Sequence, residues 1–416
     1  MAVRSPSLYH ALRCFCLGGF SVLSAEMESG VELPYSFEEH TAAGRPSLYE
    51  YRPLVRTFVE ARADRLVTRE DAKIAVEELR REPAAAIFAR AHAGVKPTEE
   101  EALLRTVLMP LLTKTAEACG GFDWDDGAFD HAYCELEHSL FGERRSYAAI
   151  APLIGLSAGT QIDLGRGLRV RPAATGELAA HWPEAAGLLP ADFGREPDRM
   201  CVLELEQALS PQATEPRDAP AELADAVTAL RLATAAPVAA GPVLFERLDW
   251  RPFGVRPVLP IAATQPTGEP SRLDSFRAGL ARELLERLAA ADDDPDLAEA
   301  LDRWELSLFQ DEPFRSEQLR ESLVALLGGT DGLWAGALRA SLLLGESGRE
   351  RSDVMGRLRM LAGGERADET AADLLRRALV ETLMHGNRLK LVEALDESLL
   401  GLRPRPAGYF AARAVA

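Results

Sequence analysis

The sequence predicts an α+β protein: a helical N-terminal region, a small β-rich middle module and a C-terminal antiparallel helical bundle. Two observations favour this class. Apolar residues recur at helical spacing over residues 68–141 and again over 275–401. Between them, short segments alternate apolar and polar residues, as half-buried strands do. The predicted divisions of the 416 residues are a leader or mis-set start (1–26), a helical region (27–147), a β-rich module (148–270) and a helical domain (271–416).

Composition and charge narrow the function classes. With 47% hydrophobic and 27% charged residues, the chain has a soluble globular composition. Its net charge of -18 repels phosphate on average, which disfavours broad non-specific nucleic-acid binding. The five cysteines are scattered and include no Cys-x-x-Cys pair, so neither a disulfide framework nor a zinc ribbon is indicated. We therefore expect a reducing compartment, the cytoplasm.

The N-terminus leaves two interpretations open. Arg4 and Arg13 precede an apolar run over residues 14–25, which is as long as a signal-peptide core but too short to span a bilayer. Alternatively, Met27 is the true start and the preceding residues are unstructured or a mis-set start. In neither case is a membrane span expected. Residues 27–51 are polar and contain Pro and Gly, so we expect an arm there.

Capping signals mark the helices of the N-terminal region. Thr68 is expected to open a helix that stops before Pro83. Thr98 and Glu101 form a capping box for a longer helix. Pro110 lies inside the apolar face of that helix, so it should kink the helix or split it in two.

One helix of this region carries a possible metal-ligand pattern. Over residues 122–141 the core-facing stripe consists of Phe129, Tyr133, Leu136 and Leu140. His131, Glu135 and His138 stand at i, i+4 and i+7 and suit zinc or iron. They lie opposite the stripe, however, where a helix normally shows polar residues to water, and no second ligand cluster exists to complete a site. We predict a solvated face, with no metal and no other cofactor.

The middle of the chain changes to a strand pattern. Strands are expected at residues 161–164, 168–171, 201–206 and 242–248. The first two are separated by Gly165-Arg166-Gly167, which predicts a β-hairpin. A helix is expected over 221–232. Trp250 is interpreted as a residue covering the sheet, with an interface anchor as the alternative.

The last third reads as a series of short helices. They are expected at residues 275–290, 297–310, 314–327, 330–344, 347–362, 368–385 and 387–400. Thr330, the Ser347–Glu350 capping box and Asn387 mark three of the starts. Short connections between such helices favour an antiparallel bundle. A homodimer through these helices is one expectation, with the face of Leu375, Leu379 and Leu383 as its contact.

A family resemblance enters in this region. The strings DRWELSLFQDEPFRSEQLRESLVALLGGTDG, LRASLLLGESGRERSDVMGRLRMLAGG, ADLLRRALVETLMHG and NRLKLVEALDESLL resemble the C-terminal domain of ApeA-like HEPN proteins. GLRVRP extends the resemblance into the middle module. The family consists of prokaryotic proteins, and the resemblance implies a helical HEPN-type domain behind an α+β region.

The resemblance also implies a site. Active HEPN domains resemble metal-independent ribonucleases that use Arg and His about five residues apart. Here Arg359 stands at the Arg position, and Gly364 stands where the His is expected. Without imidazole the motif lacks its natural acid/base near neutral pH. His385 is interpreted as part of a helix end.

Two functions of different classes follow. The first is a non-catalytic HEPN-like binding or regulatory protein, with RNA or a protein as partner and Arg359 as the RNA-contact candidate. The second is a metal-independent HEPN-type ribonuclease with a displaced site. The sequence contains no P-loop, no Gly-x-Ser-x-Gly elbow and no His-Glu-x-x-His pair, so no common alternative motif competes.

Overall fold

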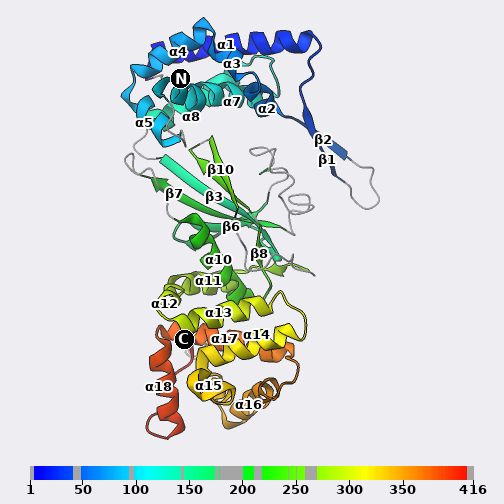
Figure 1. Cartoon of the computed structure of the whole chain (residues 1–416), viewed down its shortest axis with the longest axis vertical. Coiled ribbons are helices and arrows are strands. Elements are labelled where there is room, and N and C mark those ends of the chain that lie inside the picture. The colour runs from blue at the N-terminus through cyan, green and yellow to red at the C-terminus, as the bar shows by residue number, and fades with distance from the viewer. Residues whose placement is uncertain are drawn as a thin grey trace.

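The protein is an α+β chain whose parts follow one another along a single long axis (Figure 1). The computed structural model describes residues 4–40, 48–92, 98–141, 145–173, 178, 200–209, 218–241, 243–249, 251–257 and 269–409. Helices lie at both ends, and an antiparallel sheet lies between them. Trp250, expected to cover the sheet, lies outside the described residues.

Residues predicted as a leader or mis-set start form part of the N-terminal core. Helix α1 (Pro6–Glu28) buries one side completely, including Leu12, Phe15 and Leu23. Among the described residues it is the one helix that length and composition would allow to cross a membrane, although 44% of its most apolar window is buried. A core helix and a signal sequence share these properties. The packing of α1 does not fit an unstructured segment.

The other N-terminal helices close this core. They are α2 (Val55–Glu60), α3 (Ala63–Val67), α4 (Glu70–Arg80), α5 (Pro83–His92), α6 (Glu99–Leu103), α7 (Met109–Cys119) and α8 (Asp126–Phe141). Thr98 caps α6 by accepting from the Glu101 amide at 3.3 Å, as predicted. A π-helical turn (Leu104–Leu108) lies between α6 and α7 just before Pro110, where a kink or a split of the helix was expected.

The structure differs from the sequence-based expectations at one helix start and adds strands to the expected arm. The Thr68 hydroxyl donates to the Arg65 carbonyl at 2.9 Å and ends the preceding turn, so α4 starts at Glu70. The expected arm contains an antiparallel hairpin of β1 (Tyr35–His40) and β2 (Leu48–Pro53). These two strands were not predicted.

The central sheet has the order β10-β9-β3-β7-β6-β5 and is antiparallel. Its strands are β3 (Arg145–Ile154), β5 (Ile162–Gly165), β6 (Leu168–Pro172), β7 (Cys201–Leu209), β9 (Val243–Leu248) and β10 (Arg251–Pro257), with β8 (Ala239–Ala240) beside β3. A separate parallel pair joins β4 (Leu156–Ser157) and β11 (Ser271–Arg272). The predicted β5–β6 hairpin is confirmed, with Gly165, Arg166 and Gly167 all at positive φ.

The longest strand, β3, was missed. It is central, and described side chains on both of its faces are buried, among them Tyr147, Ala148, Ala149 and Ile150. A strand buried on both faces loses the apolar–polar alternation by which strands are recognised. The helix between the third and fourth predicted strands is present as α10 (Ala219–Thr234).

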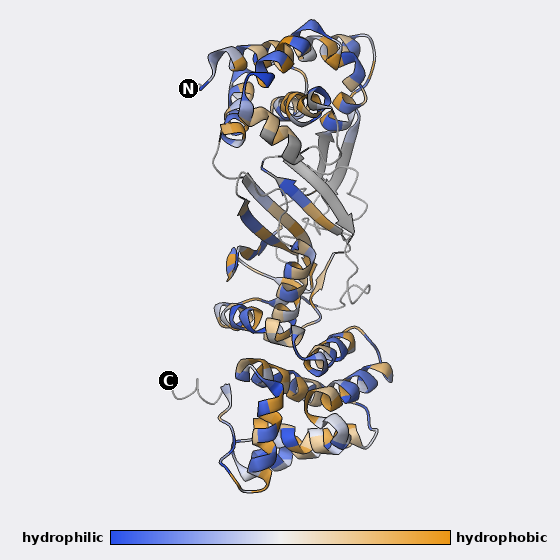
Figure 2. Cartoon of the chain, turned by 60° about the vertical axis from the view of Figure 1, so that its left-hand side comes forward, coloured by the Kyte–Doolittle hydropathy of each residue, from blue (hydrophilic) through white to orange (hydrophobic). Residues whose placement is uncertain are grey.

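The C-terminal helices are α11 (Ser275–Arg287), α12 (Ala289–Asp292), α13 (Pro295–Ser307), α14 (Phe314–Leu323), α15 (Gly332–Leu344), α16 (Gly348–Ala362), α17 (Glu369–His385) and α18 (Arg388–Leu399). The Ser347–Glu350 capping box and the Asn387 cap are confirmed. Thr330 is not a cap, since a 3₁₀ turn (Gly329–Asp331) precedes α15. Helices in Figure 2 show hydrophobic and hydrophilic residues on different sides, as amphipathic packing requires.

One hydrophobic core spans the sheet and the C-terminal bundle. It combines Tyr147 and Leu205 of the sheet, Leu230 of α10 and Trp304 and Leu379 of the bundle. The predicted boundary between residues 270 and 271 therefore falls inside a continuous core. The N-terminal helices have a core of their own.

The same core excludes the contact proposed for a dimer. Leu375, Leu379 and Leu383 are fully buried within their own chain. They cannot form a surface for a second copy, so this detail of the dimer expectation is wrong. Helical periodicity identified an apolar face correctly, but it could not show whether that face meets the same chain or another.

Candidate functional site

Arg359 lies on the surface near the end of α16, beside an exposed aromatic ring of α15. Its guanidinium carbon is 5.8 Å from the ring centroid of Trp334, within the range of a cation–π contact. Trp334 is 54% exposed. Two further apolar side chains nearby in the sequence are also exposed, Leu338 one turn along α15 and Met360 next to Arg359. We call Trp334, Leu338, Arg359 and Met360 the Arg359–Trp334 surface.

Gly364, at the position of the expected His, has a structural task. The Glu365 amide donates to the Met360 carbonyl at 3.1 Å, and the Gly364 amide donates to the Leu361 carbonyl at 3.2 Å. These two bonds form a Schellman motif that ends α16. Gly364 has φ +89°, a conformation that a side chain disfavours. The requirement for glycine here excludes an unstrained His at this position.

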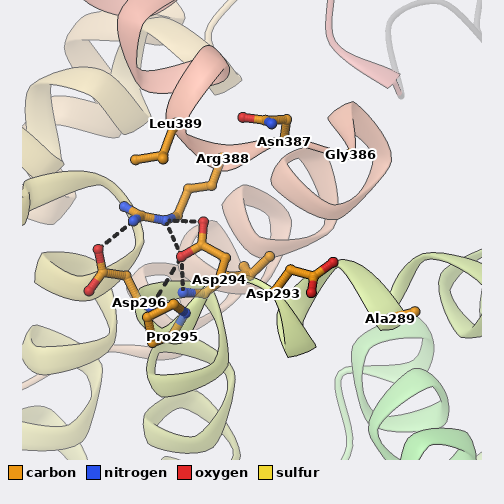
Figure 3. Close-up of a pocket in the computed structure, with 10 residues that line it drawn as sticks. Ala289, Asp293, Asp294, Pro295, Asp296, Gly386, Asn387, Arg388 and Leu389 are labelled. Carbon is orange, nitrogen blue, oxygen red and sulfur yellow. Dashed lines mark hydrogen bonds and ion pairs between the residues drawn. The ribbon is translucent and has the colours of Figure 1, made fainter.

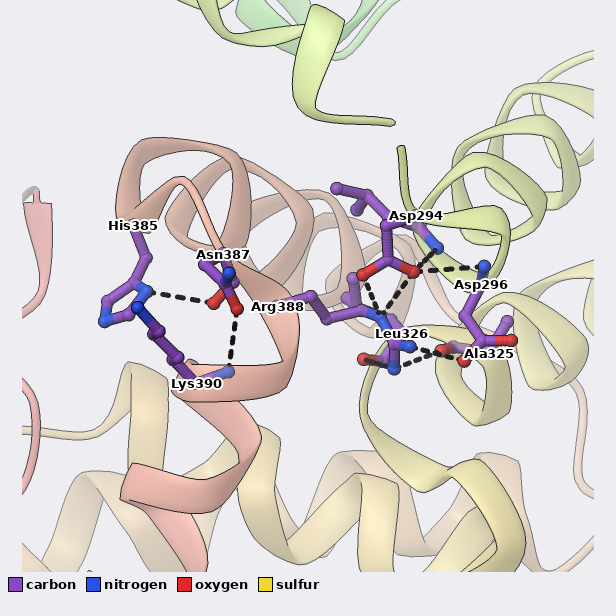
Figure 4. A network of polar contacts seen from close by, with 9 residues as sticks. Asp294, Asp296, Ala325, Leu326, His385, Asn387, Arg388 and Lys390 are labelled. Atoms are coloured by element: carbon purple, nitrogen blue, oxygen red, sulfur yellow. Dashed lines mark hydrogen bonds and ion pairs between the residues drawn. The ribbon is translucent and has the colours of Figure 1, made fainter. Parts of the chain in front are cut away.

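His385 cannot supply the missing imidazole. It ends α17, and its Nδ1 donates to the Asn387 carbonyl at 3.1 Å (Figure 4). Arg357, two residues before Arg359, pairs at 2.5 Å with Asp368 at the opposite end of α17. The 17 residues of α17 span about 25 Å at 1.5 Å per residue. His385 is the one histidine after residue 270, so no histidine of the C-terminal helices is placed beside Arg359 for proton transfer.

A cavity of about 630 Å³ lies between the starts of α13 and α18 (Figure 3). Its central group is Arg388, which is buried and pairs with Asp294 at 2.9 Å and also with Asp296. The same guanidinium donates to the carbonyls of Ala325 and Leu326, so it joins α13, α18 and the π-turn after α14 (Figure 4). Because its guanidinium is occupied by these partners, we assign Arg388 a structural role.

The residues considered for metal binding are not arranged as a site. His131 is 75% exposed and lies 3.6 Å from Glu135, which pairs with Lys114 of α7. His138 instead donates from Nδ1 to the carbonyl of Cys134 at 2.8 Å. Within the described parts of the chain, no group of three potential ligands is close enough to hold a metal ion. The predicted solvated face agrees with these contacts.

A charged cluster on the sheet was not anticipated. The buried carboxylate of Glu204 accepts from Arg169 at 3.0 Å and from Arg171 at 2.9 Å, and Arg247 lies 3.9 Å away. Burial alone would raise the pKa of Glu204, but the hydrogen bonds from Arg169 and Arg171 outweigh it and lower the pKa. The carboxylate therefore stays ionised and ties β6 to β7.

Trp334 is the residue of the candidate site that sequence reasoning missed. It begins a helix whose mean character is apolar, so the pattern offered no reason to separate it from the core. The one sequence signal was its spacing of one helical turn from Leu338, and both side chains are exposed in the structure. Comparisons of the chain with family models, curated proteins and solved structures gave no match.

Proposed function

We propose that the chain is a non-catalytic HEPN-like binding or regulatory protein that uses the Arg359–Trp334 surface. The observation that carries this proposal is the Arg359 guanidinium above an exposed tryptophan ring, with glycine in the place of the catalytic His. Arginine and tryptophan are both favoured at binding surfaces. Cleavage of RNA would further need an acid and a base at the attacked phosphate.

The way in which α16 ends supports a site without a catalytic histidine. Gly364 is fixed by the end of α16, so a His at this position would strain the backbone that presents Arg359. An arginine without the histidine fits a surface that binds a ligand but does not cleave it. A HEPN-type ribonuclease with a displaced site is the competing function.

Homodimerisation through the C-terminal helices remains part of the proposal, with a different surface. Leu389, Leu400 and Leu402 are each at least 66% exposed on or just after α18. Because the α17 leucines are buried, this exposed set is the apolar surface that α18 offers to a second copy. Light scattering after size exclusion should give twice the chain mass of 45.2 kDa, and Leu400→Asp should reduce it to one.

The decisive experiment is RNA cleavage without metal. Purified full chain is incubated with labelled single-stranded RNA in the presence of EDTA, beside Arg359→Ala and the neighbouring control Arg357→Ala. We expect intact RNA in all three samples. Cleavage by the wild type that disappears only in Arg359→Ala would establish the ribonuclease instead.

A further inference from the structure

Two Arg–Trp contacts among the described residues have the same length, 5.8 Å from the guanidinium carbon to the ring centroid, and they differ in their surroundings. Arg13 lies 5.8 Å from the Trp124 ring centroid, but Arg13 also pairs with Asp126 at 2.6 Å. The Trp124 ring is further enclosed by Phe20 and Phe129 and donates to Asp126. Both residues of this contact therefore have all their main partners within the chain.

The Arg359–Trp334 contact has none of these partners. Across the described residues, the Arg359 side chain forms no hydrogen bond or ion pair, and Trp334 contacts no other aromatic ring. The Trp334 ring is exposed to solvent, and so are the N–H donors of the Arg359 guanidinium. The difference between the two contacts points to a ligand outside the chain.

A second free arginine lies on the same face of α16. Arg349, Ser352, Gly356 and Arg359 follow at spacings of three, four and three, and all four are exposed. Arg349 also lacks a carboxylate partner in the described structure. The two guanidinium-bearing positions are about 15 Å apart along the helix. Between them, Ser352 and Gly356 are small, and a Cβ added at Gly356 would meet nothing within 4 Å.

The charges around this face do not create a strong field. Between residues 346 and 368 there are five arginines and five acidic residues, in a chain of net charge -18. Long-range attraction of a polyanion is therefore weak. A ligand must gain its affinity from contact with the ring and from the two local guanidinium groups.

We infer that this face binds unpaired single-stranded nucleic acid, with a base stacked on Trp334 and phosphates held by Arg359 and Arg349. The inference rests on the proposed function and names its ligand. Phosphate is complementary to guanidinium, and a base is complementary to an open aromatic face. Leu338 and Met360 add exposed apolar area beside the ring, so association with a protein partner is the competing outcome of the test.

The test is fluorescence anisotropy with a labelled twelve-nucleotide RNA, the DNA of the same sequence, and the RNA duplex. The full chain should bind both single strands and not the duplex. Trp334→Ala should weaken binding by about 5- to 150-fold, and Trp334→Phe should restore most of it. Phe314→Ala, which removes another exposed aromatic ring, should leave binding unchanged.

Salt dependence tests the two phosphate contacts. Two contacts with a single strand predict a slope of about -1.4 for log K against log salt. Arg349→Ala and Arg359→Ala should each reduce its magnitude by about 0.7. Arg357→Ala should not change it, because Arg357 pairs with Asp368.

Equal affinity of Trp334→Ala and wild type, or preference for the duplex, would overturn the inference. So would absence of binding by a wild type that is folded by circular dichroism. Loss of association with a protein partner in Trp334→Ala, without nucleic-acid binding, would do the same. None of these results concerns cleavage, which alone decides the proposed loss of catalysis.

Discussion

The buried ion pair between Arg231 of α10 and Glu305 of α13 should be the strongest single test of the shared core. Their closest atoms are 2.9 Å apart, and the side chains are 4% and 2% exposed. Thr228 donates to the Glu305 carboxylate at 2.6 Å, and Arg231 donates to the Val238 carbonyl at 2.7 Å. The pair thus joins the layer that covers the sheet to the C-terminal bundle.

Removal of one partner leaves a buried charge uncompensated. We expect Glu305→Leu to lower the free energy of unfolding by about 3–5 kcal/mol. The double variant Arg231→Met/Glu305→Leu should recover most of that loss, because packed apolar groups can replace a buried pair without net cost. The matched control is Glu299→Leu on the same helix, whose exposed pair with Arg303 contributes about 0–1 kcal/mol.

Urea unfolding followed by far-ultraviolet circular dichroism measures these differences. Loss of less than 1 kcal/mol in Glu305→Leu, equal to Glu299→Leu, would refute the burial of the pair. A double variant as unstable as the single one would show that Arg231 has another essential role. Either result would remove the pair as a link between sheet and bundle.

Three further predictions concern packing and thiol chemistry. Phe15→Ala should destabilise the N-terminal helical unit by about 3–5 kcal/mol, whereas a thermal melt unchanged from wild type would show that α1 is outside the core. Gly345→Ala should lower stability by about 1–3 kcal/mol in urea unfolding, because its Cβ would lie 2.6 Å from the Arg351 amide nitrogen; a neutral effect would contradict this contact. Burial raises the pKa of the Cys201 thiol to about 11, so iodoacetamide at pH 8 should label exposed Cys14 and spare Cys201 until unfolding, as peptide mass mapping would show.

The helices of the chain were largely predictable because their signals are local. The Ser347–Glu350 capping box and the glycine at the end of α7 set helix limits that tertiary contacts did not alter. The stripe from Phe129 to Leu140 was correctly placed in the core. Each signal depends on residues within a few turns of one another.

Features that depend on contacts between distant parts of the chain were harder to predict from the sequence. Strand β3 pairs with residues 48 to 101 positions later in the chain, and its burial on both faces removed the alternating pattern. The apolar run in α1 was compatible with export, and only its contacts with later helices reveal the core role. No local pattern distinguishes these environments.

The candidate site was half predictable. Arg359 was singled out from a resemblance, and the structure places it on the exposed side of α16. Trp334 is 25 residues earlier on another helix, so no motif linked the two. The resemblance predicted a His at the position of Gly364, and the positive φ of Gly364 is the physical reason that a His is disfavoured there.

The most direct test of the central claim follows one labelled single-stranded RNA through binding and recovery. The RNA is incubated with the full chain in EDTA, resolved on a native gel, then extracted and resolved under denaturing conditions. We predict a retarded band that Trp334→Ala loses, and full-length RNA after extraction. Shortened RNA that depends on Arg359 would contradict a binding surface without catalysis.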